Sequence, residues 1–179
     1  MPAASTAAHP TKIAVVAFQV AVAQTNEFQR NFADLQKKYD PRRQEIKTLS
    51  DQIDSLTKDL EAQASKLSET ERASRANAID TKKKQLQRDS EDAQNDYQQD
   101  MQGLFNSVAQ KVGQELIVYA KDKGYTAVLD FGQQQSQVLW AADSTNITKE
   151  VVDAYNQKSG IPAPPASQAL PAAPAPAAH

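Results

Sequence analysis

The chain offers few residues that could carry out nucleophilic, redox or metal chemistry. It has two histidines, His9 and His179, and no cysteine. Both histidines lie in terminal segments rich in Ala and Pro, where we expect solvated chain, and the lack of cysteine excludes disulfides and thiolate zinc sites. The sequence contains no phosphate-binding loop, dinucleotide fingerprint or nucleophile arrangement. It therefore predicts a protein that is not an enzyme, with no catalytic residues, no cofactor and no metal.

A cluster of basic side chains in the middle of the chain is a candidate for binding anionic groups. The cluster crowds residues 72–88, where Asp80 is the single acid. Such a cluster can steer acidic polypeptides or lipid head groups toward the protein. The alternative is a solvated face whose charges balance acids on a neighbouring helix. We name these residues the tip cluster: Arg72, Arg75, Lys82, Lys83, Lys84 and Arg88.

The composition limits what kind of molecule can hold these residues. Of 179 residues, 40% are hydrophobic but only 6% are aromatic, so large core-forming side chains are spread thinly. This predicts a small folded part with an extended appendage. The net charge of −2 lacks the basic footprint of a nucleic-acid-binding protein. No apolar run approaches the roughly 20 residues that span a bilayer.

Residues 26–123 are predicted to form a long helical hairpin. The region contains one proline, Pro41, which fits either a tolerated kink or short break, or a hinge. Residues 68–77 hold no large apolar side chain, and Ser68 and Glu71 match a capping box, which places the tip near 68–77. Apolar residues three and four apart mark a narrow coiled-coil seam on the outgoing helix: Ile46, Leu49, Ile53, Leu56, Leu60 and Leu67. A stripe on the returning helix widens toward its end: Ile79, Leu86, Ala93, Tyr97, Met101, Leu104, Phe105, Val108, Val112 and Leu116.

The stretch 12–25, KIAVVAFQVAVAQT, fits two interpretations. A lysine, an apolar run and Ala21-Val22-Ala23 resemble a secretion signal with its cleavage site. Alternatively, 12–18 is a strand, followed by a short helix at 19–24. Two runs after the hairpin, 125–131 and 137–141, predict a β-hairpin, which is marginal in water without a third strand. We therefore favour the strand.

Three short strands and a last helix beginning at Thr148 make a poor core for one copy. The apolar groups fall on more than one sheet face, so we expect several copies to associate through the sheet, with the helical arms projecting. The expected domains are a disordered 1–11, body segments 12–25 and 124–160, the arm 26–123 and a Pro/Ala-rich disordered tail 161–179. Residues assigned to the self-associating body are Ile13, Val15, Val128, Phe131, Val138, Leu139 and Trp140.

At this level the sequence resembles the OmpH/Skp family of periplasmic chaperones. The matching segments are KIAVVAFQ, YTAVLDFG with QVLWA, and NITKEVVDAYN, and the likeness covers about 12–158. The resemblance implies an α+β fold: a homotrimer with a small β-barrel trimerisation body and long antiparallel helical-hairpin, coiled-coil arms. It implies an ATP-independent holdase that keeps unfolded outer-membrane proteins in a cavity between the arms, with a possible peripheral contact to anionic lipid.

Two features depart from the family pattern. Some members are strongly basic, whereas this chain has a pI near 5.7. The chain also shows no signal peptide before residue 12, and we favour a start at the mature region over a protein that is not exported. Two other functions stay open: a structural coiled-coil protein whose arms bind a specific partner, and a prefoldin-like cytosolic holdase.

Overall fold

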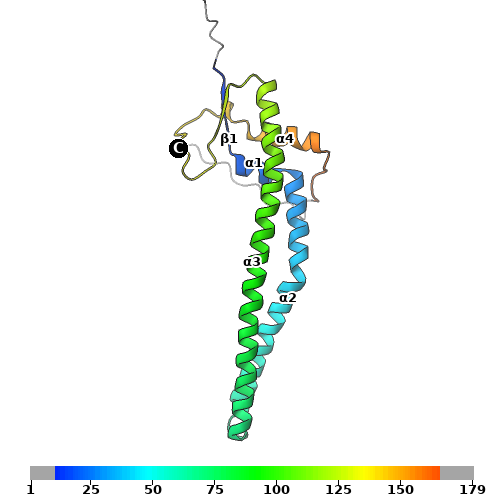
Figure 1. The fold of residues 1–179 in the computed structure, drawn as a ribbon, viewed down its shortest axis with the longest axis vertical. Helices are drawn as coiled ribbons and strands as arrows, with labels where there is room; N and C mark the ends of the chain where they lie inside the picture. The colour runs from blue at the N-terminus through cyan, green and yellow to red at the C-terminus, as the bar shows by residue number, and fades with distance from the viewer. Residues whose placement is uncertain (1–10, 166–179) are drawn as a thin grey trace, which may run out of the picture. The chain divides into compact units, whose positions relative to one another are not determined.

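Most of the chain folds into two long helices, and short strands and helices complete the structure (Figure 1). The computed structural model describes residues 11–165. His9, His179 and the predicted disorder at 1–10 and 166–179 lie outside them. In chain order the elements are β1 (Ile13–Val16), α1 (Phe18–Gln24), α2 (Asn26–Gln63), α3 (Glu69–Asp122), β2 (Ala127–Asp130), a 3-10 turn (Asp143–Thr145) and α4 (Thr148–Ser159).

The described residues divide into two compact units. The body unit comprises 11–32 and 103–165, and the arm unit comprises 33–102. Helices α2 and α3 each continue from one unit into the other, and no chain break separates the units. None of the helices in 11–165 is long and apolar enough to cross a membrane.

In the body unit, the opening stretch is a strand, as predicted. β1 pairs in parallel with β2, with Ile13 opposite Ala127 and Val16 opposite Asp130. The other edge of β1 is held by the Ile147 amide, which donates to the Val15 carbonyl over 3.0 Å. β1 therefore has a partner on each side, whereas β2 forms the edge of the sheet.

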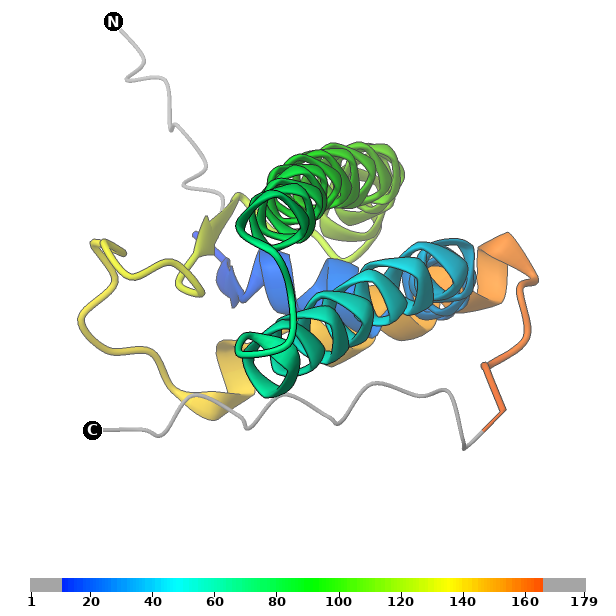
Figure 2. The same cartoon turned by 90° about the horizontal axis from the view of Figure 1, so that it is seen from below.

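Helix α1 follows β1 at once and supplies the centre of the body core. Its first amide, at Phe18, donates to the Asp130 carboxylate over 3.2 Å, so the end of β2 caps the start of α1. Figure 2 shows α1 between α3 and α4. Gly132 sits close to this junction, because a Cβ there would come within 2.9 Å of the Ala17 Cα, and only glycine avoids that clash. The core around α1 comprises Ala14, Val15, Val16, Ala17, Ala21, Val22, Phe28, Val108, Val112, Ile147, Val151, Val152 and Tyr155.

The predicted β-hairpin is wrong for this structure. The first run supplies β2, but residues 137–141 form no strand and are irregular. Val138, Leu139 and Trp140 are consecutive, so a strand here would present apolar groups to both sheet faces, and one copy covers neither of them. The sheet of residues 11–165 has two strands, and these residues of a single copy form no β-barrel.

In the arm unit, α2 and α3 run side by side as the predicted hairpin (Figure 1). The connection is 64–68, slightly earlier than the predicted 68–77, because α3 already begins at Glu69. The capping box is confirmed: the Ser68 amide donates to the Glu71 carboxylate over 2.9 Å, and the Glu71 amide donates to the Ser68 hydroxyl over 3.3 Å. Pro41 lies inside α2 without breaking it, so the short-break interpretation is wrong.

The seam between the two arm helices is as thin as the sequence indicates. Ile53 and Ile79 are buried, whereas Leu56 is exposed. The other predicted seam residues of α2 are half-buried: Ile46, Leu49, Leu60 and Leu67. Few side chains are therefore locked in the interior of the arm unit, and most remain open to solvent.

Candidate functional site

Two largely buried carboxylates of the body unit, one of them in the first turn of α2, are paired with lysines that reach the surface. The Glu27 carboxylate, largely buried, accepts hydrogen bonds from the Lys111 ammonium over 2.6 Å and from the Tyr155 hydroxyl. On the same helices, Lys158 donates to the buried Glu115 over 2.6 Å. The network joins α2, α3 and α4, because Lys111 and Glu115 belong to α3 and the other two partners belong to α4. These bonds give the buried carboxylates the partners that buried polar groups require.

The pKa of Glu27 is shifted by its burial and by its hydrogen bonds. Burial by itself would raise the pKa, but the hydrogen bonds from Lys111 and Tyr155 outweigh it and hold the pKa below its ordinary value. Burial and the hydrogen bond to Glu27 raise the pKa of Tyr155. The ionised carboxylate and the neutral phenol are thus the forms that stabilise the fold.

We expect Glu27→Gln to destabilise the protein in a pH-dependent way. At neutral pH the free energy of unfolding should fall by about 1–3 kcal/mol, because a charge-assisted pair is lost. A lowered pKa stabilises the fold above the usual carboxyl pKa of about 4.3, and this contribution disappears as Glu27 takes up its proton in acid. Urea unfolding at a series of pH values should therefore show the variant and the wild type converging as pH falls.

Glu61→Gln is the matched control, because Glu61 is exposed on the arm unit and has no salt bridge among the described residues. It should leave the unfolding free energy unchanged at every pH. A Glu27→Gln deficit as large in acid as at neutral pH would contradict the proposed role of the Glu27 charge.

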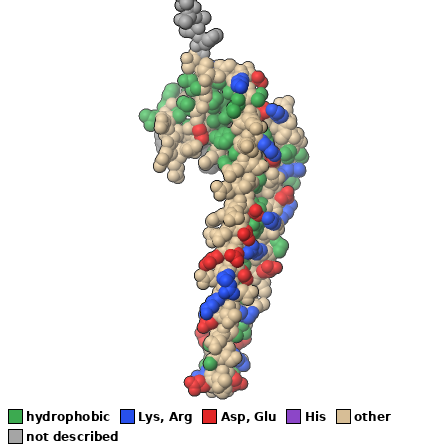
Figure 3. Space-filling model, in the orientation of Figure 1, with side chains coloured by type: hydrophobic (Ala, Val, Ile, Leu, Met, Phe, Trp, Pro, Cys, Tyr) green, Lys and Arg blue, Asp and Glu red, His purple; other side chains and the backbone are tan. Residues whose placement is uncertain are grey.

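The residues predicted to mediate self-association do not share one environment. Val15 is 4% exposed and belongs to the protomer's own core, whereas Leu139 is 96% and Trp140 77% exposed. Ile13 is also exposed, and Val128, Phe131 and Val138 are half-buried. On the face shown in Figure 3, hydrophobic side chains gather on the body unit, and charges of both signs follow the arm unit.

The sequence interpretation missed three exposed apolar side chains of the body unit. Leu129 lies on β2, and Ile117 and Val118 lie near the end of α3. Leu116, directly before them, ends the predicted apolar stripe of the returning helix, and helical periodicity turns the next two residues away from that face. The signal was therefore present in the sequence as two large apolar residues outside the stripe.

The tip cluster lies on α3 in the arm unit, and five of its six residues are exposed, with Lys82 half-buried. Arg75 donates to the Gln63 carboxamide over 2.9 Å and Lys82 to the Gln52 carboxamide over 3.2 Å. None of the salt bridges of residues 11–165 involves a member of the cluster. Both interpretations of the cluster therefore stay predictions: a contact for anionic groups, and a solvated face whose charges balance acids on the neighbouring helix.

Polar links join α2 and α3 beside Pro41. Asp100 accepts hydrogen bonds from Lys38 over 2.7 Å and from the Tyr39 hydroxyl over 2.8 Å. Arg42 donates to Asp96 over 2.6 Å. The Tyr39 and Tyr97 rings meet edge to face, with centroids 5.3 Å apart. We call this group the Pro41 clamp.

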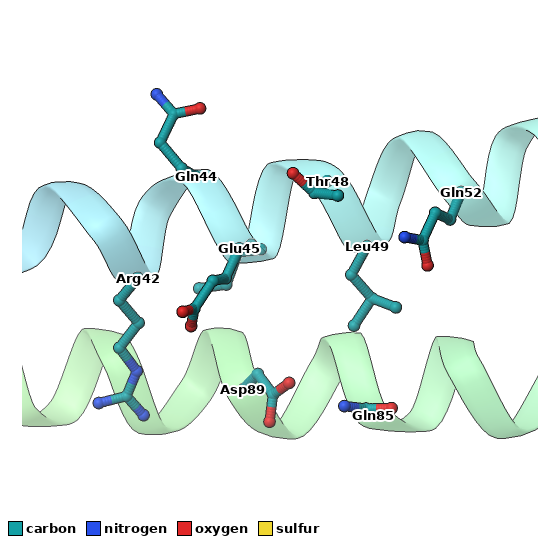
Figure 4. A pocket seen from close by; sticks show the side chains of 9 residues that line it. Arg42, Gln44, Glu45, Thr48, Leu49, Gln52, Gln85 and Asp89 are labelled. Atoms are coloured by element: carbon teal, nitrogen blue, oxygen red, sulfur yellow. The ribbon is translucent and has the colours of Figure 1, made fainter.

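Between the Pro41 clamp and the tip, a groove of about 560 Å³ opens between the two helices (Figure 4). Leu49 and Gln52 point from α2 toward α3, where Gln85 and Asp89 face them, whereas Gln44 points away. Its lining residues are Arg42, Gln44, Glu45, Ile46, Thr48, Leu49, Gln52, Gln85 and Asp89. The lining holds no nucleophile with a base, and 11–165 contain no cluster of residues suited to a metal ion.

Comparisons with known proteins agree on one family. Residues 12–155 match the family described as outer membrane protein (OmpH-like). A similar fold occurs in the crystal structure of a proposed outer membrane chaperone (OmpH-like) from Caulobacter crescentus CB15. It has a TM-score of 0.68 and 17% sequence identity, over 84% of this chain and 86% of that chain. No curated protein matches the sequence. Because the family match covers most of the chain and the fold agrees with it, this protein belongs to the OmpH-like family.

Proposed function

We propose that this protein is an ATP-independent holdase chaperone of the periplasm. In this proposal, it binds unfolded outer-membrane β-barrel proteins between its arms and prevents their aggregation. Membership of the OmpH-like family supports a chaperone role. The observation that carries the proposal is a charged two-helix arm joined to a body unit that leaves Leu139 and Trp140 uncovered. A holdase needs reach and weak, distributed contacts, and it needs no catalytic group.

The proposed working form is a homotrimer. Strands of three copies would close the small β-barrel that one chain does not form, with Ile13, Leu139 and Trp140 at the contacts between copies. Association would remove from water the apolar groups that a single copy exposes. It would also cover the open edge of β2.

The tip cluster is proposed as a peripheral contact for acidic client segments or anionic lipid. Its cations form no salt bridge with acids of residues 11–165, and five of the six are exposed, so they are accessible to an anionic group. The thin seam of the arm, with Leu56 exposed, argues against a dedicated coiled-coil partner, since specific zippers repeat apolar positions more faithfully.

Light scattering of a barrel protein diluted out of urea tests the holdase proposal. We expect full suppression of aggregation at about one trimer per client, because a bound client is withdrawn from the aggregating pool by mass action. A folded protein of similar net charge serves as the control and should leave the scattering unchanged. Unchanged scattering at a several-fold molar excess of this protein would refute the proposal.

A further inference from the structure

The groove of the arm unit has an apolar floor and a polar rim. Ile46 and Leu49 form the floor and are half-buried, so apolar surface remains open at its base. Thr48, Gln52 and Gln85 form the rim and are exposed. The volume of about 560 Å³ lies within the usual range of roughly 300–1,000 Å³ for sites that take a ligand.

The groove exists because α3 breaks the seam pattern at this place. At the groove, α3 presents Asp89, a half-buried polar residue, where the stripe would continue with an apolar one. Leu49 of α2 points toward this part of α3 (Figure 4), and Ile46 of α2 also lines the groove, so the polar Asp89 shares the groove with two large apolar side chains. On both sides of the groove along the arm, hydrogen bonds between side chains join α2 and α3.

Polar contacts between α2 and α3 flank the groove at both ends. At one end is the Pro41 clamp, where Arg42 donates to Asp96 over 2.6 Å. At the other end Lys82 donates to the Gln52 carboxamide oxygen over 3.2 Å. That bond leaves the amide hydrogens of Gln52 unused, and the side-chain carboxamide of Gln85 has no hydrogen bond to any residue of 11–165.

The chemistry of the rim matches a polypeptide backbone. A carboxamide donates and accepts hydrogen bonds, as a peptide unit does, so Gln52 and Gln85 can pair with an extended chain whatever its sequence. The floor can receive an apolar side chain of the same chain. Glu45 and Asp89 form no salt bridge in the described part of the chain, so a basic side chain is the charged neighbour that the groove favours.

We infer that this groove binds an extended segment of an unfolded polypeptide that carries an apolar side chain next to a basic one. The inference rests on the proposed holdase function and specifies how one arm holds part of its client. The carboxamides of Gln52 and Gln85 contact the backbone, Ile46 and Leu49 receive the apolar side chain, and Glu45 and Asp89 attract the cation.

Filling the groove with a larger apolar side chain should make the protein more stable and should weaken its binding of peptide. Asp89→Leu should complete the seam against Ile46 and Leu49 and raise the melting temperature by roughly 4 °C. It should weaken binding of a short fluorescent peptide, Thr and Val in alternation with a central Leu-Lys pair, by about tenfold or more. Gln98→Leu, the same kind of addition at an exposed position outside the groove, should change neither value.

Two further measurements separate the contributions. Asp89→Asn keeps the shape of the groove, and it should weaken the Leu-Lys peptide while leaving a Leu-Thr peptide unaffected. The Leu-Lys peptide N-methylated at alternate residues lacks half of its backbone donors and should bind the wild-type protein less tightly. All assays use the full chain.

The outcomes distinguish this inference from the holdase proposal. If the wild type suppresses barrel aggregation but Asp89→Leu binds the peptide as tightly as the wild type, the groove is not the site and the holdase function stands. If the wild type binds the peptide in the groove yet suppresses no aggregation, the holdase proposal fails and the groove remains a peptide site. A rise in melting temperature with unchanged peptide affinity overturns the inference.

Discussion

A variant carrying Leu139→Asp and Trp140→Asp is expected to be a folded monomer at concentrations where the wild-type chain assembles. Both side chains are almost entirely outside the protomer's own core, so the change should leave the fold of one copy intact. Each large apolar side chain that is buried on association contributes about 2 kcal/mol. Two of them correspond to roughly a thousandfold in each association constant, before the cost of burying a carboxylate is added.

Sedimentation velocity at low micromolar concentration measures this effect, and far-ultraviolet circular dichroism checks the fold. The matched control is Gln134→Asp with Gln135→Asp, which adds the same charge to exposed positions of the same loop and should assemble normally. A Leu139/Trp140 variant that still forms trimers would place the interface elsewhere. If the wild-type chain sediments as a monomer, the proposed homotrimer is refuted.

Deleting residues 42–100 is expected to abolish suppression of aggregation while preserving the trimer. The deletion takes out most of the arm unit, with the groove and the tip cluster, and spares the buried side chains of the body unit. The Glu27 network also remains, because its partners Lys111 and Tyr155 lie in the body unit. The expected product is a smaller trimer that binds no client.

Light scattering and sedimentation on the same preparation read out the two properties independently. A cooperative thermal transition of the shortened chain is the control for folding. A monomeric product would show that the arms, and not the strands, hold the copies together. A product that still suppresses aggregation would move client binding from the arms to the body.

The elements that could be predicted from sequence are those governed by local or pairwise rules. The Ser68–Glu71 capping box involves two residues three positions apart, and the structure forms it as expected. The strand at 12–18 was favoured because a later β-rich run needed a partner, and β1 does pair with β2. Both inferences used information that one chain contains.

The second strand of the predicted hairpin failed for a physical reason. Residues 137–141 have strand-like composition, but a single copy offers no surface to cover Leu139 and Trp140. The composition of this run favours β-structure, but a strand forms only where other residues pack against its side chains. The described residues of one copy do not cover Leu139 and Trp140, so the sequence alone predicts a strand at 137–141 that a single copy does not form.

The candidate functional site also has one part that the sequence predicted and one part that it did not. The tip cluster was visible as a run of cations with a single acid. The groove was not, because it depends on which residues of α2 and α3 stand opposite each other, and the register of the hairpin follows from the place of its turn. With the turn shifted from 68–77 to 64–68, Leu49 comes to face Gln85.

The pairing of β1 with β2 also dictates when each part of the molecule can fold. Lys12 and Thr126 exchange hydrogen bonds although they are 114 residues apart, so β1 has no β2 partner until residues 127–130 have been synthesised and have emerged. The hairpin closes through the short connection 64–68 and can form earlier from nearby contacts. A chain interrupted during synthesis before residue 127 would therefore carry a finished hairpin and an orphan strand, and that strand would be open to any extended neighbour.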